Sequence, residues 1–199
     1  MTNLFDKAKI IAEKVHTNQV DKKGYPYMSH VIDIASRLSH LGESYQIVGL
    51  LHDAIEDAEP SSFRSEITKE IESTFDIEII NAIKAMTKVL GEDYYKSYLP
   101  RLKKDKIAIQ VKIADASHNL SKAHLIEDRV FQNKLREKYI KVLDLLGEDG
   151  LRCEKPIIFR NGLWVEDYNV KDLRDIITTI TNNKKKMGAI LKIVGNCNV

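Results

Sequence analysis

The stretch VGLLHDAIED, residues 48–57, places two adjacent ionisable side chains, His52 and Asp53, inside a strongly apolar segment. Its apolar residues recur at helical spacing, which predicts one helix that begins near Ser44 and ends before Pro60. Burying two such groups without partners is costly, and a divalent cation would satisfy both of them. Imidazole nitrogen and carboxylate oxygen are good ligands for a borderline or hard cation. The stretch therefore predicts a helical core that contains a metal site.

Two acidic residues follow this pair by one helical turn. Glu56 lies four residues after His52, and Asp57 lies four residues after Asp53. On a helix, residues at that spacing share a face. A carboxylate one turn from a bound cation is well placed to orient an attacking water or to shuttle a proton. The alternative is that Glu56 and Asp57 form only a solvated helix end.

Two further segments offer ligands of the same kind. His30 follows Pro26 at the start of a second expected helix, and Asp115 lies on a later one, four residues before Asn119. Together with residues 52–53 they would make a mixed nitrogen and oxygen site, which favours Mn²⁺, Fe²⁺ or Zn²⁺ over Ca²⁺. His30 could instead be a simple helix-start residue, and Asp115 a partner of Lys112 or a hydrogen-bonding group of the core.

Most of the chain is predicted to be helical. Apolar residues at helical spacing predict helices over about 4–15, 31–41, 44–55, 62–74, 77–86, 107–125 and 130–146. The polar, aromatic segment 92–104 contains a proline, so its helicity is less well supported. Gly147 is a suitable stop for the final helix. The pattern predicts a mainly α domain over residues 1–148.

After residue 148 the pattern changes. Residues that favour strands flank Asn161-Gly162, a dipeptide typical of a two-residue hairpin turn. Asn169 and Asp172 resemble a helix cap, and residues 189–194 form an apolar run that could be a third strand. We therefore expect a small ββαβ-like appendage over residues 149–199.

Composition narrows the classes of function. The chain has 199 residues, and 31 Lys and Arg against 29 Asp and Glu leave a net charge of +2. A chain this apolar can fold, and a charge this balanced argues against binding long nucleic acids but not against a small anionic substrate. Two cysteines, no apolar leader and no run of about 20 apolar residues predict a cytoplasmic protein without a membrane segment.

Five segments resemble, in order and spacing, the HD-domain phosphohydrolases, specifically the RelA/SpoT-type alarmone hydrolase branch and its short stand-alone relatives. These segments are HTNQ at 16–19, GYPYMSH at 24–30, LLHDAIED at 50–57, MTK at 86–88 and KIADASHN at 112–119. The resemblance implies an all-helical bundle around one divalent ion, usually Mn²⁺, with Fe²⁺, Zn²⁺ or Mg²⁺ as alternatives. It implies removal of the 3′-pyrophosphate from (p)ppGpp.

The resemblance also implies roles for individual residues. Four side chains would hold the cation: His30, His52, Asp53 and Asp115. Two carboxylates would position and activate the attacking water: Glu56 and Asp57. Five residues would contact the nucleotide: Lys23 and Asn119, with Lys22, Lys88 and Lys112 as weaker candidates. Apart from the resemblance, we expect His16 to supply a structural or supporting hydrogen bond, and His118, near the Asp115 turn, either to orient a neighbour or to fill the core.

The chain departs from that branch after Asp115. Alarmone hydrolases usually show DRLHNMRT where residues 115–122 read DASHNLSK, so both arginines are missing. This leaves open a nucleotide phosphomonoesterase or phosphodiesterase with another substrate. A third hypothesis is a non-catalytic nucleotide-sensing module that contacts a partner through the appendage, motivated by Trp164 and the lysines at 184–186. The appendage could also mediate homo-oligomerisation.

Overall fold

A computed structural model of the chain describes residues 3–21, 24–147, 157–160 and 163–166. The chain divides into two compact units, Met1–Cys153 and Glu154–Val199. No helix among the described residues is both long and apolar enough to cross a membrane.

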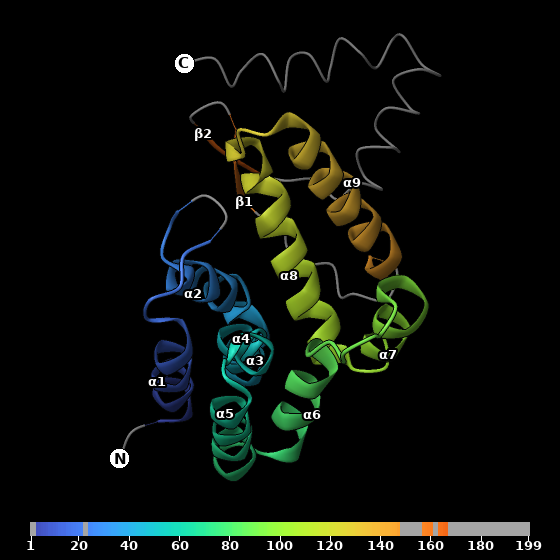
Figure 1. The fold of residues 1–199 in the computed structure, drawn as a ribbon. Helices are drawn as coiled ribbons and strands as arrows, with labels where there is room; N and C mark the ends of the chain where they lie inside the picture. Colours follow the sequence, from blue (N-terminus) through green and yellow to red (C-terminus); the bar gives the residue numbers. More distant parts are fainter. Residues whose placement is uncertain (1–2, 22–23, 148–156, 161–162, 167–199) are drawn as a thin grey trace, which may run out of the picture. The chain divides into compact units, whose positions relative to one another are not determined.

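The first unit is built from helices (Figure 1). The α-helices are α1 (Leu4–His16), α2 (Tyr27–Arg37), α3 (Glu43–Leu51), α4 (Ala54–Asp57), α5 (Ser61–Thr74), α6 (Ile77–Met86), α7 (Leu99–Leu102), α8 (Lys106–Lys122) and α9 (Arg129–Leu146). Single turns of other helix types join them: the 3₁₀ segments η1 (Ser39–Leu41) and η3 (Ala123–Leu125), and the π-helical segment η2 (Tyr94–Tyr98). The prediction of a mainly helical fold is confirmed for this unit.

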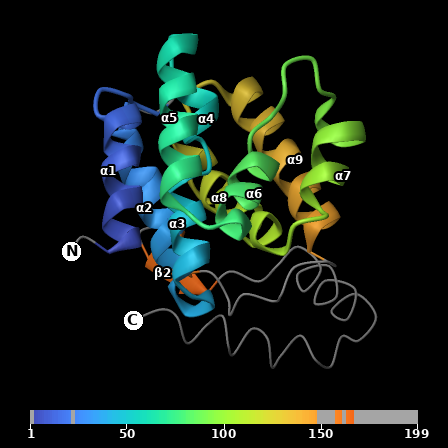
Figure 2. The ribbon, with the colours of Figure 1, turned by 90° about the horizontal axis from the view of Figure 1, so that it is seen from below.

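Helix α3 lies at the centre of the bundle. It packs against α1, α2, α6 and α8, and residues 47–51 are all buried. A helical segment that is apolar on all sides has to be covered by its neighbours, and residues 47–51 of α3 form such a segment. Helix α8 packs on α2, α3, α6 and α9, so α2, α3 and α8 meet in the interior (Figure 2). The geometry of that meeting point is set by the core, because each helix contributes fully buried aliphatic side chains to one continuous cluster.

The prediction of one continuous helix through His52 and Asp53 is wrong. Helix α3 ends at Leu51, the two residues form a turn, and α4 begins at Ala54. The His52 ring explains the break, because its Nδ1 lies 2.8 Å from the carbonyl oxygen of Gly49 and takes the acceptor that a continuing helix would use. The Asp57 N–H still donates to the Asp53 carbonyl at 2.9 Å, so α4 resumes the helix after the turn.

Other boundaries follow local chemistry. The side chain of Asn3 caps α1 by accepting from the Asp6 N–H at 2.7 Å. The helix expected over 31–41 ends at Arg37 and continues only as η1, and Gly42 then takes a φ of 111° that favours glycine. The proline in the segment 92–104 lies in the first turn of α7, where its missing N–H costs no hydrogen bond.

The described part of the second unit is a hairpin. Strands β1 (Ile157–Arg160) and β2 (Leu163–Glu166) pair antiparallel, with Arg160 opposite Leu163 and Ile157 opposite Glu166. This register agrees with the predicted turn at 161–162. The helix and third strand expected for the ββαβ-like appendage, and the lysines at 184–186, lie outside the described residues. The domain boundary at 148 therefore stays a prediction.

Candidate metal centre

Four of the predicted site residues converge where α2, α3 and α8 meet. One ligand atom each from His30, His52 and Asp53 lies within 4.8 Å of the others. The two Nε2 atoms of the histidines are 3.4 Å apart, and His52 Nε2 is 3.0 Å from Asp53 Oδ2. Asp115 adds Oδ1 at 3.5 Å from His30 Nε2 and 4.0 Å from His52 Nε2. Both imidazoles and the Asp115 carboxylate are buried, and the Asp53 side chain is 26% exposed.

Hydrogen bonds fix which nitrogen of His52 faces the cluster. Its Nδ1 lies 2.8 Å from the carbonyl oxygen of Gly49, which can only accept, so Nδ1 carries the proton in the neutral ring. Nε2 then points a lone pair at the carboxylates of Asp53 and Asp115. A protein ligand to a divalent cation needs this tautomer, and the partner of the other ring nitrogen is what selects it.

The two carboxylates of the cluster are also held in place. Lys112 Nζ donates to Asp115 Oδ2 at 2.9 Å, and Asn119 Nδ2 donates to Asp115 Oδ1 at 2.5 Å. The Tyr27 hydroxyl donates to Asp53 Oδ2. Burial works against the charged carboxylate, but Lys112, His30 and His52 together outweigh it and keep the pKa of Asp115 well below its usual range. The Asp115 carboxylate is therefore ionised at neutral pH.

The field at the centre favours positive charge. Burial disfavours an imidazolium at His52, yet the carboxylates of Asp53 and Asp115 outweigh burial and raise its pKa to about 9. Burial would likewise raise the pKa of Asp53, and the adjacent His52 lowers it below its usual range. A site that attracts a proton this strongly also suits a divalent cation, which would replace that proton. The donor set and its electrostatics thus fit the metal that the sequence predicts.

The two α4 carboxylates lie in a different environment. Glu56 is exposed, and its Oε2 accepts from the backbone N–H of Lys88 at 3.0 Å. Asp57 is half-buried, and its Oδ2 accepts from Gln19 Nε2 at 2.8 Å. Gln19 Oε1 in turn lies 2.5 Å from Nδ1 of the buried His16. Burial raises the pKa of Asp57 above its usual value in spite of the hydrogen bond from Gln19.

The predicted substrate contacts are placed unevenly. Lys112 and Asn119 lie at the centre, where both donate to the Asp115 carboxylate. Asp115 is therefore a partner of Lys112, as the alternative for this residue predicts. The Lys112 side chain is 13% exposed. Lys88 is exposed beside Glu56. Lys22 and Lys23 lie outside the described residues.

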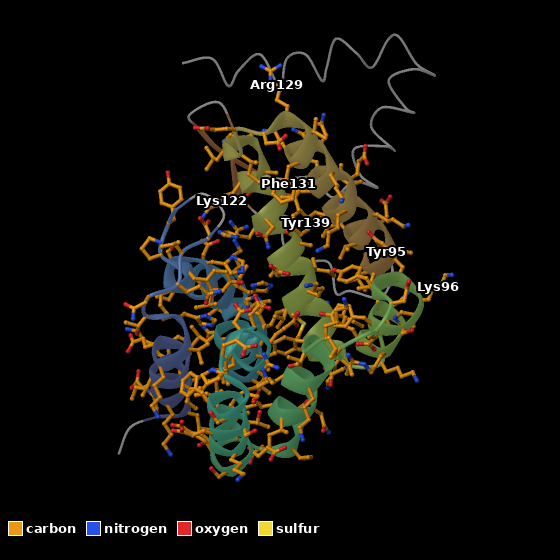
Figure 3. All side chains as sticks on the ribbon, in the orientation of Figure 1. Tyr95, Lys96, Lys122, Arg129, Phe131 and Tyr139 are labelled. Carbon is orange, nitrogen blue, oxygen red and sulfur yellow. The ribbon has the colours of Figure 1, made fainter. Side chains whose placement is uncertain are left out.

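Lysine side chains of α9 lie over tyrosine rings of η2 and α9, and the sequence does not predict these contacts. Lys138 Nζ lies 4.8 Å from the ring centroid of Tyr94 and 5.4 Å from that of Tyr139, and Lys141 Nζ lies 4.0 Å from that of Tyr95. Figure 3 shows Tyr95 on η2 and Tyr139 on α9. Burial, and after it the charge of Asp115, raises the pKa of Tyr139. Only the high tyrosine content of 94–98 could have indicated these cation–π contacts.

Other supporting residues were also missed by the sequence reading. Tyr27 lies three residues before His30, so one helical turn brings its hydroxyl to the cluster. Gln19 belongs to a segment that carries the family resemblance, but no role followed from that. The contact of Gln19 with Asp57 spans 38 residues, a separation that local patterns do not reveal.

Comparison with known proteins agrees with this geometry. Residues 8–131, more than half of the chain, match the family model described as HD domain. A guanosine-3′,5′-bis(diphosphate) 3′-pyrophosphohydrolase of Borreliella burgdorferi is 28% identical over 198 residues, covering 90% of this chain and 28% of the relative. The protein of the same name from Spiroplasma citri is 29% identical over 193 residues, covering 89% of this chain and 23% of the relative.

Two further similarities bear on the length and the fold. A GTP pyrophosphokinase of Myxococcus xanthus is 27% identical over 165 residues, covering 76% of this chain and 22% of the relative. The chain spans about a quarter of the length of these curated relatives. The solved structure of a metazoan ortholog of SpoT that hydrolyzes ppGpp superposes with a TM-score of 0.61 at 22% identity, covering 77% of this chain and 91% of that one. Given the match over residues 8–131 and the shared helical fold, the chain belongs to the HD domain family.

Proposed function

We propose that this chain is a metal-dependent phosphohydrolase that removes the 3′-pyrophosphate of (p)ppGpp. The observation that carries the proposal is the buried convergence of His30, His52, Asp53 and Asp115 beside the α4 carboxylates. The names of the relatives support the choice of substrate, because two of them are guanosine-3′,5′-bis(diphosphate) 3′-pyrophosphohydrolases. The reaction consumes one water and converts ppGpp into GDP and pyrophosphate.

The cation would be held by two imidazole nitrogens and two carboxylates. His30 and His52 offer Nε2, and Asp53 and Asp115 offer carboxylate oxygens. This mixed set suits Mn²⁺, which we propose as the working ion, with Fe²⁺, Zn²⁺ and Mg²⁺ as alternatives. When bound, such an ion lowers the pKa of a coordinated water and neutralises charge on phosphate oxygens.

The α4 carboxylates would handle the attacking water. Asp57 has a raised pKa, so it is a stronger base than an ordinary aspartate and can accept a proton from that water. Gln19 fixes the Asp57 carboxylate by donating to Oδ2, which leaves Oδ1 for the water. Glu56 is held by the Lys88 N–H through Oε2, and we propose that its other oxygen orients the same water.

Substrate binding would use the charges around the centre. We propose that Asn119 contacts the sugar and that Lys23 and Lys88 approach phosphates, with Lys22 as a further candidate. Lys112 would act mainly through Asp115, because its ammonium group already donates to that carboxylate at 2.9 Å. Residues 1–148 would form the catalytic domain, and residues 149–199 a separate appendage that could mediate oligomerisation.

The test is product identification with purified, Mn²⁺-loaded protein. Ion-exchange separation of a ppGpp reaction should show GDP and pyrophosphate in equal amounts. A panel of nucleoside mono-, di- and polyphosphates and cyclic nucleotides should be run beside it. Orthophosphate or a ring-opened nucleotide as the product would favour the phosphomonoesterase or phosphodiesterase alternative, which the missing arginines motivate. No turnover on the whole panel would overturn the enzymatic proposal.

A further inference from the structure

We propose that His118 and Asp33 are positioning residues that set the orientation and the tautomer of His30, so that its Nε2 offers a lone pair to the cation. The proposal rests on the metal centre proposed above and deepens it. The family resemblance given above assigns neither residue to the metal site.

The geometry links three side chains in a row. His118 lies on α8 and is 1% exposed, and its Nδ1 is 2.8 Å from Nδ1 of His30. On its other side, His118 Nε2 lies 3.2 Å from Asp33 Oδ2. Asp33 belongs to α2, three residues after His30, so the same helix supplies both ends of the row. His118 thus lies between the metal ligand and a carboxylate one helical turn away from it.

The positions of the protons follow from the Asp33 carboxylate. Arg37 Nε donates to Asp33 Oδ2 at 2.7 Å, which fixes the orientation of this carboxylate. The negative charge of Asp33 lies 3.2 Å from Nε2 without a hydrogen bond to it, and it favours the tautomer of neutral His118 that carries its proton on Nε2 and a lone pair on Nδ1. His30 must then donate from Nδ1, and its Nε2 is left with the lone pair.

That lone pair is aimed at the centre. His30 Nε2 lies 3.4 Å from His52 Nε2 and 3.5 Å from Asp115 Oδ1. The second ligand, His52, is set by the Gly49 carbonyl, so two different devices give both histidines the same tautomer. A metal-ligating histidine usually donates its other ring N–H to a neighbouring acceptor, and His118 Nδ1 is that acceptor for His30.

A purely structural role makes a different prediction. If His118 only filled space, a phenylalanine would serve as well, and Asp33, whose side chain is 37% exposed, would not matter to metal binding. The positioning role requires an acceptor at the place of Nδ1. Asparagine can put its amide oxygen there, so His118→Asn should restore part of what His118→Phe removes.

The experiment measures Mn²⁺ affinity by calorimetric titration of the metal-free protein. His118→Phe and Asp33→Ala should each bind Mn²⁺ about 10- to 100-fold more weakly than wild type, the usual effect of losing such a support. His118→Asn should lie closer to wild type. Asp76→Ala is the matched control for Asp33→Ala, because Asp76 is exposed and makes no side-chain cap bond. Melting curves in excess EDTA check that the variants fold.

A second readout is independent of affinity. A long-range ¹H–¹⁵N spectrum of the Zn²⁺-loaded protein should show the His118 proton on Nε2 and the His30 proton on Nδ1. The opposite assignment, or wild-type Mn²⁺ affinity in folded Asp33→Ala, would overturn the proposal even if His118→Phe failed to fold. If the wild-type chain bound no divalent cation, the metal centre itself would be wrong, and that result is distinct from a failure of His118 alone.

Discussion

The buried cluster of His30, His52, Asp53 and Asp115 and the α4 carboxylates differ in how their oxygens are used. At the cluster, side chains of a tyrosine, a lysine and an asparagine donate to the two aspartates, and every member except Asp53 is buried. On α4, Glu56 and Asp57 each accept a hydrogen bond from a neighbour through one carboxylate oxygen, Oε2 and Oδ2 respectively. The first arrangement suits holding a cation, and the second suits handling a water. Variants of the two regions should therefore fail in different ways.

The largest effect is expected from a ligand of the cluster. His52→Ala removes the nitrogen that lies 3.0 Å from Asp53 Oδ2 and 3.4 Å from His30 Nε2. Metal chemistry of this kind contributes several kcal/mol to the barrier, so turnover should fall by about 10³-fold or more together with Mn²⁺ binding. Calorimetry and product release measured on the same preparation check this. Full activity with no bound metal would contradict the assignment.

Glu56→Ala should separate chemistry from metal binding. We expect Mn²⁺ affinity to stay near that of wild type, because Glu56 is exposed and outside the cluster, while kcat falls by about 10²- to 10⁴-fold. Glu56→Gln is the matched control, since its amide oxygen can still accept from the Lys88 N–H. If the glutamine variant were fully active, Glu56 would only hold the loop after α6.

Gln19→Ala tests how Asp57 is held. Loss of the 2.8 Å bond to Oδ2 frees the Asp57 carboxylate to rotate, so kcat should fall by about 10-fold or more with little change in KM. Steady-state kinetics at saturating Mn²⁺ measure the two parameters separately. An increase confined to KM would instead point to a substrate contact for Gln19.

Gly49→Ala probes the packing that brings the two histidines together. A Cβ at this position would lie 3.1 Å from the Ala35 Cα and 3.1 Å from Leu38 Cδ1, so α2 and α3 would have to separate. Overpacking of this kind costs about 1–3 kcal/mol of unfolding free energy. Urea denaturation of the metal-free protein measures it. Because α2 carries His30, Mn²⁺ affinity should fall as well, and unchanged stability would show that the helices can adjust.

The smallest effect concerns acid stability away from the centre. Hydrogen bonding to Arg101 lowers the pKa of Glu92 to about 2 from a usual 4.5. A carboxyl group whose pKa is lowered on folding adds stability above its unfolded pKa, and that contribution is lost as the pH falls from about 4.5 towards 2. Glu92→Gln should flatten the pH dependence of the unfolding free energy in this window. An unchanged slope in denaturation curves would contradict the role of the pair.

The sequence predicts which side chains converge at the cluster better than it predicts the residues that hold them. His30, His52, Asp53 and Asp115 are recognisable because their residue types and helical contexts suit a metal. The turn at His52 is not, since Ala54 and Ile55 continue the apolar pattern of α3. A hydrogen bond from a side chain to a backbone carbonyl, such as that of His52 to Gly49, does not alter the spacing of apolar residues, so the sequence pattern cannot reveal it.

Contacts across long separations escape the sequence for the same reason. The supports His118 and Gln19 act on residues 88 and 38 positions away. The hydrogen bond between Lys112 and Asp115 spans only three residues of one helix, and helical spacing predicts it as the alternative role of Asp115. Local spacing thus reveals ligands and helical pairs, whereas tertiary packing decides which side chains orient them.

The most direct test follows Mn²⁺ occupancy and pyrophosphate release in one titration of wild type and Glu56→Ala with ppGpp. The account predicts one Mn²⁺ per chain for both proteins and pyrophosphate release that rises with occupancy only for wild type. Pyrophosphate release by the metal-free chain, or full occupancy without release by wild type, would contradict the central claim.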